Sequence, residues 1–464
     1  MAKLKRKIPV KSGDHLELEV ETLASSGDGL CHYKGYTLFI PDSLPGDRVR
    51  GNVIKTTQRF GVVDIFERIE LSKNRIKPPC PVFFKCGGCK FQDLNYKNQL
   101  EFKIQVVRDS LSRIGGIELP EKIEAHAADR QYHYRNKGSF AVQGKASDPQ
   151  IGFYSEGSHI IADSPVCDIL LEPINKVKEW LRQLLKKNQI SIYHEQYHRG
   201  LVRGLVIRHS ESTTETLVGI ITNGDRFPRS FLSELTEKKK LKELGIVGLV
   251  QNINPRATNV ILGKENKILW GKERLTDKLG DVIFHLSLGS FFQIHPEQTL
   301  YLYNLIQTWS DTSAKEKIIV DAYSGSGGIA LWLAAKGKTV IAIEQLGEAM
   351  EDARLSAKTN GINQCHFLSG NVEEHAPRVI LEKDVHTFIV DPPRKGCSET
   401  VIKTLLESQP EQIIYVSCNP STLARDLGKL EGYLIKDLRV IDMFPQTYHV
   451  ETAVLLQQNA ANKS

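Results

Sequence analysis

The C-terminal third of this chain alternates short apolar runs with amphipathic stretches of helical length. The strand-like runs lie at 318–321, 339–344, 387–391 and 413–418, and the helical stretches lie at 329–336, 349–360 and 399–406. Because parallel neighbouring strands need a crossover, usually a helix, this alternation predicts a doubly wound parallel sheet. Such sheets bind ligands at the carboxyl ends of their strands, so functional residues are expected there.

The chain has 464 residues, too many for this sheet and one shared core, and two further domains are expected. Residues 1–72 contain short alternating runs separated by Gly-containing turns, which is typical of a small oligonucleotide-binding (OB-like) barrel. Residues 73–286 combine a helix at 96–114 with many strand-like runs and predict an α+β domain. The sheet domain would occupy 287–464. The predicted class is therefore a multidomain α/β protein.

Positive charge is concentrated in one segment. The formal net charge is only +6, but residues 72–113 hold nine Lys or Arg against three Asp or Glu.

No secretory apolar core follows the basic N-terminus, and no apolar run is long enough to span a bilayer. A cytoplasmic protein with no membrane partner is expected. In a reducing compartment its eight cysteines are expected to be metal ligands, catalysts or isolated thiols rather than disulfides.

A glycine-rich loop follows the first strand of the predicted sheet. It runs from Asp321 through Tyr323 to Gly328 and leads directly into a helix, where glycines allow backbone N–H groups to approach a ligand. Glu344 ends the next strand about twenty residues later, where a carboxylate reaches ribose hydroxyls. Asn371 is expected beside the adenine. The spacing Asp-x-x-x-Gly-x-Gly is similar to that of class I methyltransferases that bind S-adenosylmethionine. The alternative for Glu344 is an exposed acid at a strand end.

A second constellation is built from cysteines. Cys80, Cys86 and Cys89 follow the pattern C-x5-C-G-G-C, whereas zinc sites usually use two close pairs. Three close thiolates and a remote fourth favour a cubane [4Fe–4S] cluster. Cys167 is the preferred fourth ligand because it follows a turn and lies outside the cofactor domain. The other candidates for that position are Cys31, Cys365 and Cys397. A zinc site or unligated thiols are the alternatives.

The last predicted strand stops abruptly at a thiol, Cys418. The turn Asp391-Pro392-Pro393-Arg394 precedes it, and His449-Val450-Glu451 follows it. A thiol at a strand end, together with these acids, favours covalent catalysis on an electrophilic ring. Taken alone, Cys418 would be a buried structural thiol, Glu451 an ion-pair partner on the surface and Asp391 an ordinary turn residue.

Motifs over nearly the whole chain resemble those of bacterial RNA uracil-5 methyltransferases that carry a TRAM barrel and an iron–sulfur cluster. The 23S ribosomal RNA branch is the most similar. The motifs are CGGCKFQ at 86–92, YRNK at 134–137, SFFQIHP at 290–296, DAYSGSGGIAL at 321–331, DPPRKG at 391–396, SCNP at 417–420 and FPQTYHVE at 444–451. The positions that depart from the usual family pattern are His295, Ser324, Gly328 and Ser356.

The resemblance implies a role for each site. Cys418 would be the nucleophile and Glu451 the base. The implied cofactors are S-adenosylmethionine and a [4Fe–4S] cluster. The residues implied to bind the methyl donor are Gln293, Tyr323, Glu344 and Asp391. The implied cluster ligands are Cys80, Cys86, Cys89 and Cys167.

The predicted reaction makes carbon 5 of uracil nucleophilic. Cys418 adds to carbon 6, carbon 5 accepts the methyl group, and Glu451 then removes the carbon 5 proton. A stacked base cannot reach the thiol, so the target is expected in a single-stranded or loop region. The resemblance implies that this region belongs to 23S rRNA, and a monomeric enzyme is expected. The first alternative is the same reaction on tRNA. An alternative of another class is a non-catalytic RNA-binding ribosome assembly factor.

Overall fold

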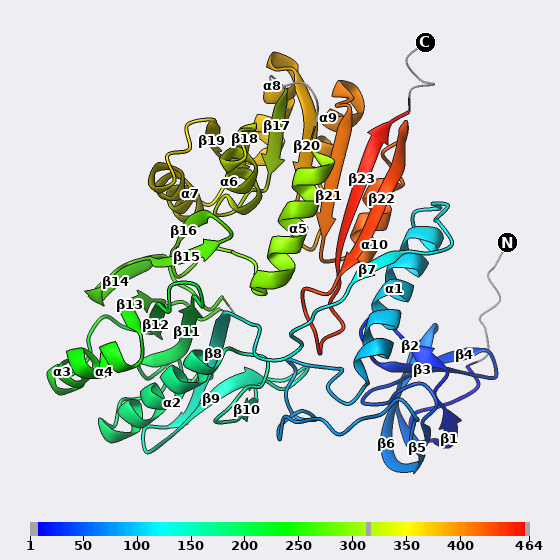
Figure 1. Cartoon of the computed structure of the whole chain (residues 1–464). Coiled ribbons are helices and arrows are strands. Elements are labelled where there is room, and N and C mark those ends of the chain that lie inside the picture. Colours follow the sequence, from blue (N-terminus) through cyan, green and yellow to red (C-terminus); the bar gives the residue numbers. More distant parts are fainter. Residues whose placement is uncertain (1–7, 259, 312–316, 460–464) are drawn as a thin grey trace.

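The computed structural model describes residues 8–258, 260–311 and 317–459. Its strands form three large sheets: one at the N-terminus, one in the centre of the chain and one at the C-terminus (Figure 1). No helix within the described ranges has the length and apolar character needed to cross a membrane. The multidomain α/β class predicted from the sequence agrees with this mixed architecture.

The N-terminal sheet has six strands in the order β1-β5-β6-β4-β3-β2, and all neighbours are antiparallel except β4 and β6. The strands are β1 (His15–Glu19), β2 (Thr22–Leu23), β3 (Gly29–Tyr33), β4 (Tyr36–Ile40), β5 (Arg48–Thr56) and β6 (Phe60–Glu70). Alternation of apolar and polar residues along β5 places Val49 and Val53 in the core, where Cys31 also lies. The strands predicted in this region are confirmed.

The central sheet has seven strands in the order β10-β9-β8-β11-β12-β13-β14, and only β12 and β13 are parallel. Its strands are β8 (Lys137–Lys145), β9 (Asp148–Tyr154), β10 (Ile161–Asp163), β11 (Val202–His209), β12 (Thr216–Thr222), β13 (Ile246–Ile253) and β14 (Glu265–Gly271). The helices of this region are α1 (Tyr96–Arg113), α2 (Glu172–Lys187), α3 (Arg229–Leu235) and α4 (Lys238–Glu243). The apolar stripe of α2 packs into the core of this sheet.

The C-terminal sheet has eight strands in the order β19-β18-β17-β20-β21-β23-β22-β7. The strands are β7 (Glu124–His126), β17 (Ile318–Ala322), β18 (Thr339–Glu344), β19 (Cys365–Ser369), β20 (Val385–Val390), β21 (Gln412–Ser417), β22 (Tyr433–Ile441) and β23 (Glu451–Gln458). The helices are α5 (Pro296–Trp309), α6 (Gly328–Ala335), α7 (Gly347–Thr359), α8 (Val372–Glu382), α9 (Glu399–Ser408) and α10 (Pro420–Leu427). Strands β17 to β21 are parallel, which confirms the predicted doubly wound arrangement.

Three parts of the middle segment pack with the strands or helices of the C-terminal sheet. Strand β7 adds an edge strand parallel to β22, and α1 packs along α10 and β22 (Figure 1). The hairpin of β15 (Leu275–Leu279) and β16 (Val282–Leu286) shares a hydrophobic core with α5 and α6. The domain boundaries at 72/73 and 286/287 stay predictions.

Candidate active site

The predicted catalytic residues meet at the carboxyl edge of the C-terminal sheet. Cys418 follows β21, and Asp391 follows the neighbouring strand β20. Pro420 starts α10 and the Asn419 side chain caps that helix, so the strand ends at the thiol. Strand β23 runs antiparallel to β21 with Thr452 opposite Ser417, which brings Glu451 next to Cys418. The fold therefore joins a thiol and two acids from separate segments.

The electrostatic environment of Cys418 disfavours its thiolate. Burial raises the pKa of the thiol to about 11, and the charges of Glu451 and Asp391 contribute to this rise. The Arg394 guanidinium acts in the opposite direction. The Arg394 carbonyl accepts a hydrogen bond of 2.9 Å from the Asn419 side chain, so this cation is tied to the residue that follows the nucleophile.

Three acids lie close enough to influence one another. Burial raises the pKa of Glu451 well above its usual range, and the charge of Asp391 raises it further. Burial also raises the pKa of Asp391 to about 7. Asp321 accepts a hydrogen bond of 2.9 Å from the Ala330 N–H, yet burial and then the Asp391 charge raise its pKa to about 8. A buried carboxylate at position 451 is therefore strongly basic, and with 2% of its surface exposed Glu451 is not the surface ion-pair partner of the alternative interpretation.

The glycine loop after β17 adopts the conformation that its sequence predicts. Gly325 and Gly327 have φ values of +56° and +79°, and Tyr323 also has a positive φ of +63°. Glu344 accepts hydrogen bonds from the Gly325 N–H at 2.9 Å and from the Leu346 N–H at 2.8 Å. Its relative exposure is 8%, so it is not the exposed strand-end acid of the alternative interpretation.

The other predicted cofactor residues differ in their exposure. Gln293 is buried between β16 and α5, and its carbonyl accepts a hydrogen bond of 3.3 Å from the Asn136 side chain. Asn371 is exposed immediately before α8 and donates to Glu374 at 3.2 Å. The Tyr323 hydroxyl donates to Glu373 at 3.4 Å. The roles of these residues in binding the methyl donor stay predictions.

The structure explains the glycine at position 328. A Cβ atom there would lie 2.1 Å from the hydroxyl oxygen of Tyr303, a buried residue of α5. Burial and the charges of Asp391 and Asp321 raise the pKa of this phenol, which keeps the hydroxyl protonated. Sequence reasoning missed Tyr303 because nothing in the motif around Gly328 points to a helix that precedes it in the chain.

His449 is a second residue whose placement the sequence did not specify. Its Nε2 atom lies 3.4 Å from Nη2 of Arg394. Burial, followed by the charges of Arg394 and Lys103, lowers the pKa of His449 to about 4. The imidazole is therefore neutral near pH 7 and can accept a hydrogen bond from the guanidinium. The signal that could have pointed to a functional role for His449 was its place beside Glu451 in the HVE motif.

The structure brings the four cysteines predicted to bind a cluster into one region. Cys89 and Cys167 pack against the same hydrophobic cluster, and the charges of Cys167, Cys86 and Cys80 each raise the pKa of Cys89. Burial raises the pKa of all four thiols, that of Cys167 to about 11. The other three candidates lie in separate hydrophobic cores: Cys31, Cys365 and Cys397. Among the residues that the structure describes, no group of three His, Cys, Asp or Glu is arranged to hold a metal ion.

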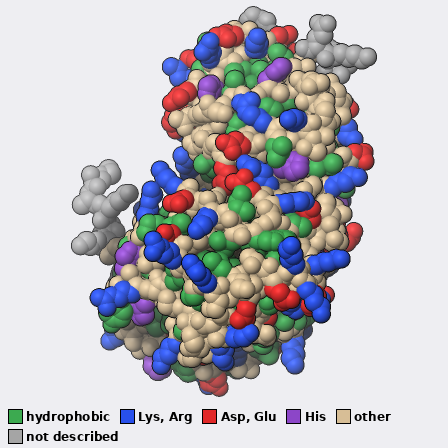
Figure 2. Space-filling view, turned by 90° about the vertical axis from the view of Figure 1, so that its left-hand side faces the viewer, with side chains coloured by type: hydrophobic (Ala, Val, Ile, Leu, Met, Phe, Trp, Pro, Cys, Tyr) green, Lys and Arg blue, Asp and Glu red, His purple; other side chains and the backbone are tan. Residues whose placement is uncertain are grey.

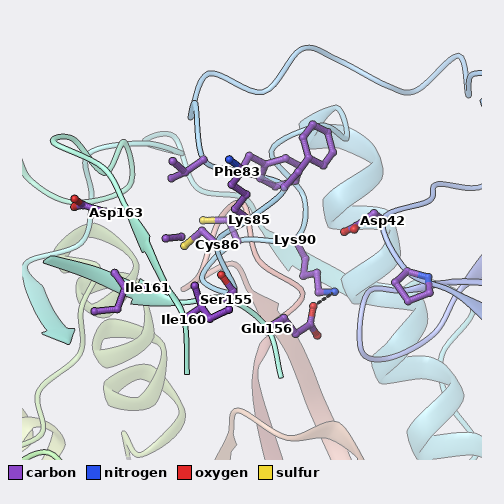
Figure 3. Close-up of a pocket in the computed structure, with 15 residues that line it drawn as sticks. Asp42, Phe83, Lys85, Cys86, Lys90, Ser155, Glu156, Ile160, Ile161 and Asp163 are labelled. Atoms are coloured by element: carbon purple, nitrogen blue, oxygen red, sulfur yellow. Dashed lines mark ion pairs between the residues drawn. The ribbon is translucent and has the colours of Figure 1, made fainter. Parts of the chain in front are cut away.

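A cavity of about 640 Å³ opens beside the cysteine loop, and Cys86 and Cys89 line it together with Pro41 and Asp42 after β4 and residues of the β9–β10 loop. Figure 3 shows Lys90 extending towards Glu156, with which it forms an ion pair. Lys90 also pairs with Asp28 at 2.9 Å. This lysine therefore joins the N-terminal region to the loop between β9 and β10.

Comparison with known proteins identifies the family. Residues 234–459 match the family model described as tRNA (Uracil-5-)-methyltransferase. An RNA methyltransferase of Clostridium tetani is 38% identical over 98% of both chains, and one of Halalkalibacterium halodurans is 39% identical over 98% of this chain and 99% of its own. The solved structure of Pyrococcus abyssi tRNA (uracil-54, C5)-methyltransferase in complex with S-adenosyl-L-homocysteine is 27% identical and has a TM-score of 0.78, covering 95% of this chain and 100% of that one.

The doubly wound sheet, its glycine loop and these similarities define the class of protein: the chain is an S-adenosylmethionine-dependent methyltransferase that acts on RNA. It belongs to the RNA (uracil-5-)-methyltransferase family.

Proposed function

We propose that this enzyme methylates carbon 5 of a uridine in 23S rRNA through a covalent adduct between Cys418 and carbon 6. The observation that carries the proposal is the pairing of β21 with β23, which places Glu451 beside Cys418 at the carboxyl edge of the sheet. A nucleophile and a buried base on adjacent strands are the two groups that this chemistry requires.

The residues of the chain account for each step. S-adenosylmethionine, when bound, supplies an electrophilic methyl group. Cys418 adds to carbon 6, and the ring electrons move towards the carbon 4 carbonyl, so that carbon 5 becomes nucleophilic. Carbon 5 can then accept the methyl group, whose former bond to the sulfonium breaks with both electrons on sulfur. Glu451 then takes the proton from carbon 5. The electrons of the C–H bond restore the ring double bond, and the Cys418 sulfur leaves with its bonding pair.

The raised pKa values fit these roles. A carboxylate desolvated like Glu451 is a stronger base towards a carbon-bound proton than an exposed one. Cys418, whose pKa is about 11, needs a positive neighbour to form its thiolate, and Arg394 is the residue whose charge lowers that pKa. Alignment of the thiol, the ring and the methyl donor contributes roughly 7–11 kcal/mol to such reactions.

The methyl donor would lie against the glycine loop. The residues proposed to bind it are Gln293, Tyr323, Glu344, Asn371 and Asp391. The N–H groups of the loop and the N-terminus of α6 favour this placement. Glu344 already accepts from Gly325 and Leu346, so its oxygens are oriented towards the loop and can accept ribose hydroxyls at their remaining lone pairs.

We propose that Cys80, Cys86, Cys89 and Cys167 hold a [4Fe–4S] cluster. The mutual influence of the four thiols supports this, and the Gly88 N–H donates to the Cys86 sulfur at 3.4 Å, as backbone amides do in such sites. The spacing of the cysteines along the sequence, with only one close pair, disfavours zinc, whose sites usually use two such pairs. The cluster would stabilise the loop rather than carry out redox chemistry.

The choice of 23S rRNA depends on the N-terminal sheet and the cysteine loop. We propose that the sheet is a TRAM barrel that binds RNA. Lys and Arg side chains are spread over both lobes of the molecule (Figure 2) and would contact phosphates over a wide surface. The second candidate is tRNA, which is favoured by the likeness to the tRNA (uracil-54, C5)-methyltransferase of Pyrococcus abyssi.

Mapping 5-methyluridine by mass spectrometry in ribosomal and transfer RNA from a deletion strain tests the substrate. Loss of one or more sites from 23S rRNA is expected, and loss from tRNA alone would favour the second candidate. RNA containing 5-fluorouridine should trap the enzyme at Cys418, because fluorine cannot leave as a cation. An unchanged methylation pattern in the deletion strain would favour an assembly factor without catalytic activity. Iron and sulfide in anaerobically purified protein test the cluster.

A further inference from the structure

Glu451 is preceded by a buried turn, residues 442–450, which we call the base turn. Partners outside it satisfy three successive carbonyl groups. The Phe444 carbonyl accepts from the Lys103 ammonium at 2.9 Å, the Pro445 carbonyl from the Tyr134 hydroxyl at 3.1 Å, and the Gln446 carbonyl from the Lys90 and Phe91 N–H groups at 3.1 and 3.0 Å. The turn that leads to the base is therefore held by residues far away in the sequence.

Gln99 of α1 makes the most specific contact with the base turn. Its amide donates to the Gln446 side-chain oxygen at 3.0 Å, and its own oxygen accepts from the Gln446 backbone N–H at 3.1 Å. The two glutamines are only 1% and 2% exposed. Gln446 also has a φ of +69°, a conformation that residues other than glycine rarely adopt. The reciprocal pair stabilises this strained residue within the base turn.

The same glutamine reaches the segment that follows Cys89. The Gln99 amide nitrogen also lies 2.9 Å from the Phe91 carbonyl and 2.8 Å from the Leu94 carbonyl, so its two hydrogens are shared among three acceptors. Gln99 therefore joins three segments: α1, the residues after the cysteine loop, and the base turn. Because amide hydrogen bonds are directional, this arrangement fixes the turn more tightly than apolar packing does.

We infer that Gln99, through Gln446, is a positioning residue that aligns Glu451 with carbon 5 of the methylated adduct. This inference rests on the proposed function. Addition of Cys418 and methyl transfer come before the base acts, so a displaced Glu451 slows only the last step. In that step the proton of carbon 5 passes to Glu451, its electrons form the ring double bond, and the sulfur–carbon 6 bond breaks with both electrons on sulfur.

The test compares Gln99→Met with Gln105→Met. Methionine keeps the length of the side chain but removes its hydrogen bonds, whereas Gln105 is exposed on the same helix and donates to Asp109 at 3.0 Å. Each protein is mixed with RNA containing ordinary uridine and S-adenosylmethionine, then quenched in denaturant to measure the covalent adduct. Because a displacement of about 1 Å can cost a hundredfold in rate, adduct release should slow by roughly 10- to 100-fold in Gln99→Met. Gln105→Met should resemble the wild type.

Gln446→Asn provides a second variant, because asparagine tolerates a positive φ and its shorter side chain cannot accept from the Gln99 amide, while the backbone N–H of residue 446 still donates to Gln99. It should accumulate the same adduct, while both variants should react with RNA containing 5-fluorouridine at the wild-type rate. Normal release in both variants would overturn the positioning role. A reduced rate of adduct formation without accumulation would also overturn it. Failure of the wild type to form any adduct would instead refute the proposed covalent mechanism.

Discussion

The buried ion pair between Lys103 of α1 and Asp442 at the start of the base turn leads to a prediction about stability. Both side chains are 0% exposed, and Lys103 Nζ lies 2.6 Å from Asp442 Oδ1. Asp442 also accepts from the Tyr96 hydroxyl at 2.7 Å. Lys103→Met would leave the carboxylate buried with one neutral donor. Breaking such a pair costs about 3–5 kcal/mol, because the remaining charge has lost its partner but is still out of water.

The measurement is the free energy of unfolding in urea, followed by intrinsic fluorescence. Lys97→Met is the matched control, since Lys97 lies on the same helix, is 85% exposed and is 3.8 Å from Glu101. Its loss should change the free energy of unfolding by no more than about 0.5 kcal/mol. The double variant Lys103→Met, Asp442→Asn removes both charges and should recover most of the loss. A cost below about 1 kcal/mol for Lys103→Met would refute the argument that this pair is desolvated and coupled.

Four further predictions concern the site itself. Glu451→Gln should accumulate the covalent adduct on ordinary uridine RNA, with release slowed by roughly 10²–10⁴-fold, as measured by gel electrophoresis after quenching. The rate at which Cys418 is alkylated in the free enzyme should increase about tenfold for each unit by which the pH rises, up to its pKa of about 11, because only the thiolate reacts. Asp391→Asn should raise that rate at pH 8 because a negative neighbour of the thiolate is lost; an unchanged rate would contradict the assigned electrostatics. Gly328→Ala should destabilise the enzyme by about 1–3 kcal/mol in urea unfolding, and adding Tyr303→Phe should relieve part of the cost.

Much of the fold follows from local patterns. The strands at 339–344 and 413–418 and the helix at 96–114 lie within one or two residues of β18, β21 and α1. Periodicity and glycine placement were sufficient to predict these elements because each one buries an apolar face that its own sequence defines. The pattern did not predict that 124–126 would join the C-terminal sheet, because an edge strand of three residues carries too little periodicity to assign a partner.

The residues of the candidate site also fall into those that the sequence predicted and those that it did not. Cys418, Asp391 and Glu344 were predicted because strand ends in a parallel sheet share one edge, whatever the details of packing. Tyr303, Lys103 and the partners of Gln446 were not predicted. Gln99 and Gln446 are separated by 347 positions, and no local pattern in either segment encodes the contact.

The sequence by itself determined which elements form and which strand end carries the thiol, because these depend on residues that are neighbours along the chain. Only the tertiary structure decided that an antiparallel strand enters the sheet beside β21 and brings Glu451 to Cys418. It also decided that α1 and the residues after Cys89 hold the turn before that base. The physical reason is that burial, and with it the raised pKa of Glu451, arises from contacts between segments that are distant in sequence.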